Sequence, residues 1–171
     1  MIHLNIGSNL NSNFGNKFDN ISIAIKLLID NKFDVKKISN FYDTPSYPNK
    51  NLPNFLNVGI FGTFSKSAKE LRNIISFIEK KIGRVKSKKN DSRVCDIDII
   101  DFNGENLDTD NLTIPHKKCH QRNFVLFPIS QIDPNWEHPI LKKKVNVLIG
   151  QLDLKSRIEI TRLNKNVNIT S

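Results

Sequence analysis

The sequence contains few of the residues that build covalently linked or metal-held folds. It has two cysteines, Cys95 and Cys119, among 171 residues, and they do not form a C-x-x-C pair. We therefore expect neither a disulfide framework nor a structural zinc site, and we expect a protein of the reducing cytoplasm. No apolar run approaches the ~20 residues that a membrane span requires. The opening MIHLNIGSNL lacks the basic and apolar regions of a secretory signal.

Two common phosphate-binding motifs are also missing. The chain has no G-x-x-x-x-G-K-[ST] sequence and no G-x-G-x-x-G sequence. A P-loop and a dinucleotide-binding turn are therefore not expected. If ATP is bound, a different kind of site must hold its phosphates.

An excess of positive charge is the main feature of the composition. The chain carries 26 Lys and Arg against 17 Asp and Glu, a formal net charge of +9. Such a charge indicates an anionic partner, which can be a nucleic acid, a membrane surface or a phosphorylated small molecule. The length suits one domain, which we place over residues 1–171, and 38% hydrophobic residues suffice for a core.

Hydrophobic residues recur with strand and helix periods in turn. The expected strands span residues 2–6, 35–42, 56–60 and 94–102, and the expected helices 18–31 and 67–82. Ser67 and Glu70 form a capping-box pattern at the second helix, and Gly83 is a natural stop. The order predicts an α+β fold, a ferredoxin-like βαββαβ core with an antiparallel sheet and both helices on one face. C-terminal additions follow, including a short extended piece at 112–114 and a helix at 122–130.

Asp96 and Asp98 form the sharpest local motif. Side chains alternate along a strand, so both carboxylates project from one face, ~6.6 Å apart along the strand. Two buried negative charges are costly unless a cation lies between them. Magnesium is the obvious candidate, because it prefers carboxylates, waters and phosphate oxygens. The alternative is a solvated sheet face that happens to carry two acids.

A basic segment leads into this pair. It includes Arg84, Lys86, Lys88, Lys89 and Arg93. Such a segment can gather a triphosphate and its metal ion, because Arg forms forked contacts with phosphate oxygens and Lys supplies a mobile charge. The alternative is a solvated charge run. Residues 84–92 lack apolar periodicity, and we predict that they form a mobile lid that orders over ATP.

His116, Cys119 and His120 give a third candidate. The two histidines have the i, i+4 spacing of one helix face, but the sequence indicates no third ligand, so a metal site has weak support. His3 and His138 have no supporting context. We expect that one of the clustered histidines binds a phosphate or that neither has a role.

Several segments, taken in order, resemble one known family. They are IGSNL at 6–10, SNFYDTP at 39–45, PNFLN at 53–57, RVCDIDII at 93–100, IPH at 114–116 and RNFVLFP at 122–128. Their order and spacing resemble the 6-hydroxymethyl-7,8-dihydropterin pyrophosphokinase family over most of the chain. The resemblance implies a ferredoxin-like fold and an enzyme of folate biosynthesis that transfers pyrophosphate from ATP to a pterin alcohol, giving AMP and the pterin diphosphate.

The resemblance also implies roles for individual residues. Two magnesium ions would be held by Asp96 and Asp98. Catalysis would involve these acids with Arg84 and Arg93. The pterin would be bound by Thr44, Pro45, Phe55, Asn57 and Phe124. The co-substrate ATP would be bound by Ser76, Arg84, Lys86, Lys89, Arg93, Ile99, Thr113, His116 and Arg122. We expect a monomer that binds these small molecules and neither nucleic acid nor membrane.

The chain departs from the family pattern mainly in the basic segment. Asn90-Asp91-Ser92 stand where the family usually has a Trp beside a Gly-Pro pair. Ser76, Lys86, Asn111 and Lys117 replace a Gln, an Arg, a second Arg and a Tyr. Two rival functions stay open: a paralogue that binds pterin and ATP with weak turnover, and a basic ferredoxin-like RNA-binding module. The paired acids disfavour the second, because they would repel RNA.

Overall fold

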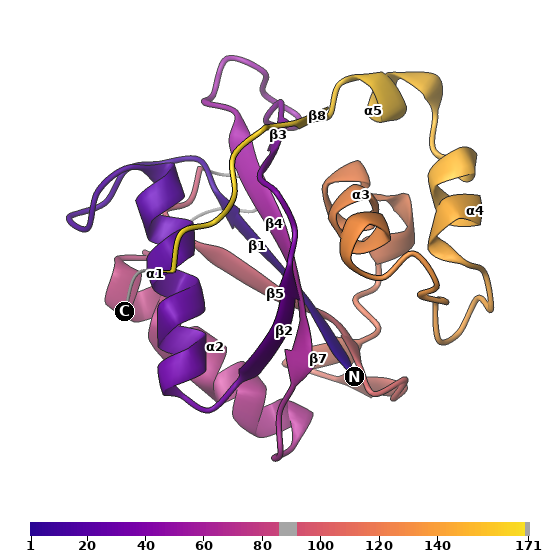
Figure 1. Cartoon of the computed structure of the whole chain (residues 1–171), viewed down its shortest axis with the longest axis horizontal. Coiled ribbons are helices and arrows are strands. Elements are labelled where there is room, and N and C mark those ends of the chain that lie inside the picture. The colour runs from indigo at the N-terminus through magenta and orange to yellow at the C-terminus, as the bar shows by residue number, and fades with distance from the viewer. Residues whose placement is uncertain (86–91, 170–171) are drawn as a thin grey trace.

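A six-stranded antiparallel sheet organises the computed structural model, which describes residues 1–85 and 92–169 (Figure 1). Its order is β5 (Asp96–Phe102), β1 (Ile2–Ser8), β4 (Phe55–Thr63), β3 (Tyr42–Thr44) and β8 (Thr161–Arg162). The strand β2 (Asp34–Ile38) also pairs with β4. With the two helices between these strands, the predicted βαββαβ ferredoxin-like core is confirmed.

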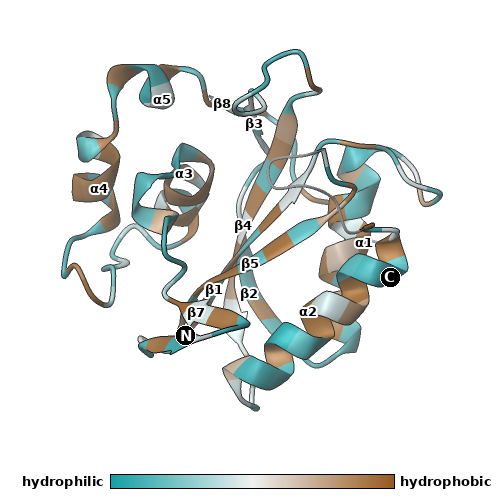
Figure 2. Cartoon of the chain, turned by 180° about the vertical axis from the view of Figure 1, so that it is seen from behind, coloured by the Kyte–Doolittle hydropathy of each residue, from teal (hydrophilic) through white to brown (hydrophobic). Residues whose placement is uncertain are grey.

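Two helices cover one face of the sheet. They are α1 (Lys17–Asp30) and α2 (Ala68–Ile82), which pack with the strands around one core. The capping box predicted for α2 is present, because Ser67 accepts from the Glu70 backbone N–H and Glu70 accepts from that of Ser67. The helix ends at Gly83, whose φ of 105° is left-handed. Figure 2 shows apolar and polar residues alternating along α2.

The opposite face is partly covered by α3 (Asn123–Ile132), which confirms the helix predicted at 122–130. It packs against β4 at Gly59, where a Cβ atom would lie 2.8 Å from the Cβ of Pro128. The helix α4 (Val145–Gln151) shares a second core with α3, and α5 (Leu154–Ile158) follows. These are the C-terminal additions.

Smaller elements connect β5 to α3. The strands β6 (Leu107–Thr109) and β7 (Leu112–Ile114) form a hairpin, and the 3-10 helix η1 (Cys119–Gln121) precedes α3. The predicted turn after β5 is confirmed, because Asn103 and Gly104 both have positive φ, 54° and 73°. The strand β6 was not predicted.

One predicted strand is divided. The alternation over 35–42 predicts one strand, but the structure has β2 and β3 with a break between them. At the break the hydroxyl of Ser39 accepts the backbone N–H of Gly59 at 2.9 Å, so a side chain takes the place of a ladder carbonyl. Among residues 1–85 and 92–169, no helix has both the length and the apolar character needed to cross a membrane.

Candidate active site

Strand register aligns the predicted metal and pterin residues in one row. Gly7 of β1 pairs with Asp96 of β5 on one side and with Asn57 of β4 on the other. Residues at one ladder position project from the same face, here the face turned away from α1 and α2. Adjacent strands lie ~4.8 Å apart, so the Cα atoms of Asp96 and Asn57 are about 10 Å apart. Asp96, a predicted metal ligand, and Asn57, predicted to bind the pterin, therefore lie on either side of one glycine.

Gly7 lies between predicted site residues, and the sequence motifs did not indicate a role for it. A Cβ atom there would lie 3.1 Å from Oδ1 of Asn57 and 3.7 Å from Cδ1 of Phe55. A side chain would thus occupy the space between the two predicted subsites. The signal in the sequence was the single glycine of IGSNL, which ends a buried strand where β-branched residues would be favoured.

Asp96 is held by two arginines. Nη1 of Arg84 lies 2.8 Å from its Oδ1, and Nη1 of Arg93 contacts its Oδ2. The backbone of Arg93 is fixed in turn, because its N–H donates to Oδ1 of Asn9 at 2.7 Å. Three predicted catalytic residues are therefore brought together, and the cationic pair points at the acid expected to bind metal.

Glu79 is a buried acid that sequence reasoning missed. Its Oε1 accepts the backbone N–H of Ile97 at 2.8 Å and contacts Nη1 of Arg84, while Oε2 lies 3.8 Å from Arg72. Burial raises the pKa of Glu79 above its ordinary value. Because Ile97 stands between Asp96 and Asp98, this carboxylate fixes both β5 and Arg84. An acid inside the apolar stripe of α2 was the available signal.

Asp98 carries a charge that is less fully paired. Its Oδ2 lies 3.6 Å from Nη1 of Arg122. Burial, followed by the neighbouring Asp96 carboxylate, raises the pKa of Asp98. Asn5, its ladder partner on β1, has a buried Oδ1 with no hydrogen-bond partner among the described residues. Carboxylate and amide oxygens of this kind are the ligands that hard divalent cations prefer.

A cleft of about 320 Å³ opens beside β5 and collects predicted ATP residues. Its lining includes Asp98, Ile99, Thr113 and His116, together with Arg72, Asn111 and Lys117. Arg122 adds a positive charge beside the cleft, because its Nη1 lies 3.4 Å from Nε2 of His116. Burial is the largest cause that lowers the pKa of His116, so the ring accepts hydrogen bonds more readily than it carries charge.

The predicted pterin residues gather on the same side of the sheet. Nδ2 of Asn57 donates to Oγ1 of Thr44 at 3.0 Å, and Phe55 is the ladder partner of Thr44. Pro45 directly follows β3 and is half-buried. Phe124 lies in the first turn of α3, with the guanidinium of Arg122 5.4 Å from its ring centre. The predicted pterin residues thus come from two paired strands and from a helix that packs against them.

Six of the nine predicted ATP residues are not among the described residues that line this cleft. Arg84 and Arg93 lie at Asp96 instead, and Arg122 lies at Asp98. Ser76 is exposed on α2 and does not line it, although it lies one turn from Arg72, which does. Lys86 and Lys89, with most of the predicted lid, fall within residues 86–91, which lie outside the described part of the chain.

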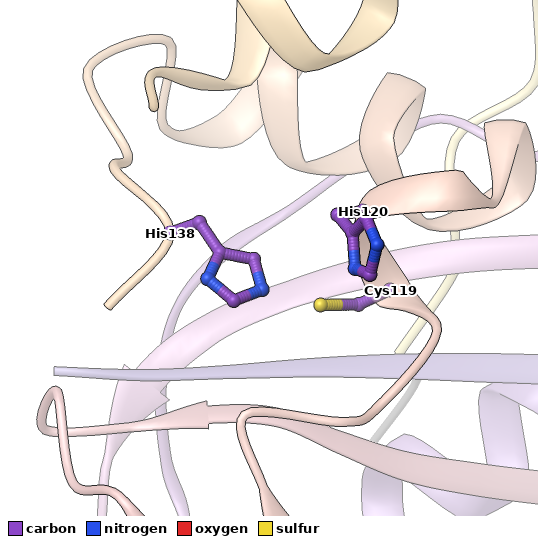
Figure 3. A group of neighbouring side chains, drawn as sticks. All are labelled: Cys119, His120 and His138. Carbon is purple, nitrogen blue, oxygen red and sulfur yellow. The ribbon is translucent and has the colours of Figure 1, made fainter. Parts of the chain in front are cut away.

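The cluster around Cys119 contains a side chain that the sequence did not indicate. His138 joins Cys119 and His120, and their potential ligand atoms lie within 4.8 Å of one another (Figure 3). A zinc site would bring such atoms to about 3.3–3.8 Å, given its bond lengths. Nδ1 of His138 accepts the backbone N–H groups of Ile140 and Leu141, each at 3.2 Å. These contacts occupy Nδ1 of His138, and the three side chains as they stand are more widely spaced than zinc ligands.

Comparison with known proteins finds relatives whose descriptions all refer to pterin pyrophosphokinases or to folate synthesis. A family model described as 7,8-dihydro-6-hydroxymethylpterin-pyrophosphokinase (HPPK) matches residues 3–134. The 2-amino-4-hydroxy-6-hydroxymethyldihydropteridine pyrophosphokinase of Aquifex aeolicus is 32% identical over 156 residues, which cover 90% of this chain and 93% of that protein. The folic acid synthesis protein FOL1 of Dictyostelium discoideum is 36% identical over 146 residues, which cover 85% of this chain but 22% of that protein.

Solved structures agree on the fold. The crystal structure of wild-type Plasmodium falciparum HPPK-DHPS superposes with a TM-score of 0.68 and 16% identity, over 94% of this chain and 47% of that chain. The chain therefore spans less than half of that crystallised protein, and the low identity supports the fold alone. Because the family model spans most of the sequence and the Aquifex protein matches it nearly end to end, this chain belongs to the HPPK family, the ATP-dependent pyrophosphokinases of folate biosynthesis.

Proposed function

We propose that this chain catalyses direct pyrophosphoryl transfer on the sheet face that carries Asp96, Gly7 and Asn57. The pterin hydroxymethyl oxygen attacks the β-phosphorus of ATP, the bond from that phosphorus to the α-phosphate oxygen breaks, AMP leaves, and the hydroxyl proton is released. The observation that supports this is the ladder row itself. It sets the amide of Asn57 and the first of the two acids, Asp96, on either side of Gly7, and Asp98 projects from the same face of β5.

The pterin residues supply recognition. A flat heterocycle with a polar edge needs aromatic faces to stack on and an amide to read its edge. Phe55 and Phe124 are half-buried and belong to the two sides of the pocket, while the amide of Asn57 is buried and already oriented by Thr44. This orientation reduces the freedom lost on binding and aligns the hydroxymethyl group for attack.

The basic residues act on the phosphates. Arg84 and Arg93 lie at Asp96, and Arg122 and His116 lie at Asp98. Arg84 and Arg93 would turn from Asp96 to the phosphates when substrate binds, and could then stabilise charge that develops on the transferring group. The cleft beside β5, with Ile99 and Thr113 in its lining, is where we place the rest of ATP.

The metal ions fit the residues present. The raised pKa of Asp98 and the Oδ1 of Asn5, which has no hydrogen-bond partner within residues 1–85 and 92–169, are features that a bound divalent cation would relieve. Asp96 and Asp98 would hold two magnesium ions, which supply charge neutralisation and alignment of the phosphates when bound. We also propose that the chain is a monomer and works in the cytoplasm, where its two free, buried thiols would stay reduced.

Product analysis tests the reaction. Incubation with magnesium, ATP and 6-hydroxymethyl-7,8-dihydropterin should release AMP and the pterin diphosphate in equal amounts. Release of ADP would contradict pyrophosphoryl transfer. Binding of both ligands without turnover would indicate the rival paralogue, whose motivation is that Ser76 and Asn90-Asp91-Ser92 replace family residues.

A further inference from the structure

The C-terminal end of the chain contacts both sides of the proposed pterin pocket. We call residues 154–167 the C-terminal strap; it consists of α5, β8 and the segment that follows β8. In Figure 1 it runs from α5 past β3 and on toward α1. The strap lies outside residues 3–134, which the family model matches, so the family pattern assigns it no role.

The strap first completes the sheet beside β3. Tyr42 and Arg162 are ladder partners, and β3 ends two residues later in Thr44. Leu163 and Val167 then pack against the main core, which anchors the end of the strap. A three-residue strand with no partner on one side would be a frayed edge. The strap therefore fixes the strand that presents the hydroxyl of Thr44 to the pocket.

A hydrogen-bond network links the strap to α3. Oδ1 of Asn40 accepts from Nε of Arg162 at 2.9 Å and from Nε2 of Gln131 at 2.6 Å. Gln131 lies on α3, and its Oε1 accepts from the Tyr42 hydroxyl at 3.0 Å. The side-chain amide of Asn40, just before β3, is thus hydrogen-bonded to both β8 and α3. Phe124 lies on α3, and Thr44 lies on β3. Arg162 therefore connects the two walls of the proposed pocket, the β3 wall and the α3 wall.

Two more contacts reach the pocket from α5 and its end. Nζ of Lys50, in the loop between β3 and β4, lies 3.3 Å from Oε2 of Glu159. Nδ2 of Asn123 donates to the carbonyl of Ser156 at 2.7 Å, and Asn123 directly precedes Phe124. The strap thus contacts the loop on one side of the pocket and the start of α3 on the other.

We propose that the C-terminal strap sets the affinity for the pterin substrate by holding these two walls at a fixed separation. Glu159 and Arg162 are positioning residues, which act through Lys50 and Asn40. The proposal deepens the proposed function and rests on it. ATP binding should be spared, because the cleft lies beside β5, at the opposite end of the sheet order from β8.

Calorimetry on the full chain separates the two ligands. We would measure the Kd of a non-hydrolysable ATP analogue with magnesium, and then the Kd of 6-hydroxymethyl-7,8-dihydropterin at saturating analogue. Glu159→Gln should weaken pterin binding about two- to fivefold, the range expected for a partly exposed ion pair. Arg162→Ala should weaken it about tenfold, because it removes a charged hydrogen bond. The analogue Kd should stay the same in both variants.

Two further variants sharpen the test. Arg157→Ala on the exposed side of α5 removes the same charge as Arg162→Ala and should leave pterin binding unchanged. Lys50→Glu should weaken pterin binding, and adding Glu159→Lys should restore it. A Glu159→Gln variant with unaltered pterin Kd, or an equal loss for both ligands, would overturn the role of the strap. Failure of the unaltered chain to bind pterin would instead overturn the proposed function.

Discussion

Nη1 of Arg84 lies 2.8 Å from Oδ1 of Asp96, so the predicted phosphate-binding cation and the predicted metal ligand are in contact. The same guanidinium contacts Glu79, which also accepts the Ile97 backbone N–H next to that acid. One arginine is therefore held between a buried acid of α2 and the acidic strand. Asp96 is therefore paired with two arginines, whereas Asp98 has, among the described residues, only the more distant Arg122. The first two predictions follow from this difference.

Removing Asp98 or Asp96 should affect stability in opposite directions. Asp98→Asn should hold or raise the melting temperature, because burial and Asp96 disfavour its charged form. Asp96→Asn should lower stability by about 1–3 kcal/mol, since Arg84 and Arg93 lose a shared partner. The sequence alone predicts that removing either acid relieves repulsion, and these contacts reverse that expectation for Asp96.

Both variants should nearly abolish turnover at saturating magnesium. Thermal unfolding and an AMP-release assay on the same preparations would check the two properties together. The exposed Glu105→Gln serves as a control that removes an acid beyond the end of β5. Near-normal turnover in either variant would show that the metal-pair assignment is wrong.

Glu79→Gln should lower kcat while leaving the fold intact. Burial disfavours the charged form of Glu79, so a neutral residue of equal size should be tolerated, and its amide oxygen can still accept the Ile97 N–H. Arg84 would lose one of its two carboxylate partners and sample other positions. We expect about a tenfold loss of kcat, smaller than the roughly 10²–10³-fold loss that is typical when a donor to transition-state charge is removed outright. An unchanged kcat in steady-state assays would count against a positioning role.

Gly7→Ala should weaken pterin binding more than ATP binding. The added Cβ would sit 3.1 Å from Oδ1 of Asn57, so the amide must shift. Overpacking of this kind costs about 1–3 kcal/mol. Gly150→Ala is the matched control, because its Cβ would meet nothing within 4 Å. Calorimetry with each ligand would show the difference, and equal losses for both would argue for a general distortion of the sheet.

Asn57→Ala should also weaken pterin binding more than ATP binding, but for a different reason. It removes the amide instead of moving it, and it leaves the Thr44 hydroxyl without its donor. The expected loss is ~1–3 kcal/mol in pterin binding, the cost of an unpaired buried polar edge. ATP affinity should remain close to that of the unaltered chain. A parallel loss of ATP affinity would point to a purely structural role for this residue.

His138 should make the fold sensitive to mild acid. Burial, with a smaller effect from His120, lowers the pKa of His138 below its ordinary 6.5. Its contribution to stability is therefore complete above about pH 6.5 and is lost as the pH falls through the folded value. Protonation would also break the two N–H bonds that Nδ1 accepts from Ile140 and Leu141.

The variant His138→Asn isolates this effect, because an amide oxygen can replace Nδ1 as the acceptor and does not titrate. When the pH is lowered from about 7.5 to about 5.5, the melting temperature of the unaltered chain should fall by more than that of this variant. NMR titration of the His138 ring should give a pKa below 6.5. A value at or above 6.5 would contradict the prediction.

Local sequence determined much of the fold. The apolar stripe of α2, its capping box and its terminal glycine depend on residues within one or two helical turns, and all three are present. The alternation that places Asp96 and Asp98 on one face is equally local. It holds in β5, where Ile97 is buried between two half-buried acids. Short-range patterns of this kind can be read from the chain because their energetics involve only near neighbours.

Long-range contacts decided the rest. The chain separates Gly7 from Asn57 by 50 positions, and only the register of β1 with β4 and β5 reveals that Gly7 lies between the amide and the acids. The buried role of Glu79 and the break at Ser39 likewise depend on partners distant in sequence. The sequence therefore determined the main helices and strands of the core and indicated most of the candidate site residues. The tertiary structure decided how they meet, because register and burial arise from packing between distant segments.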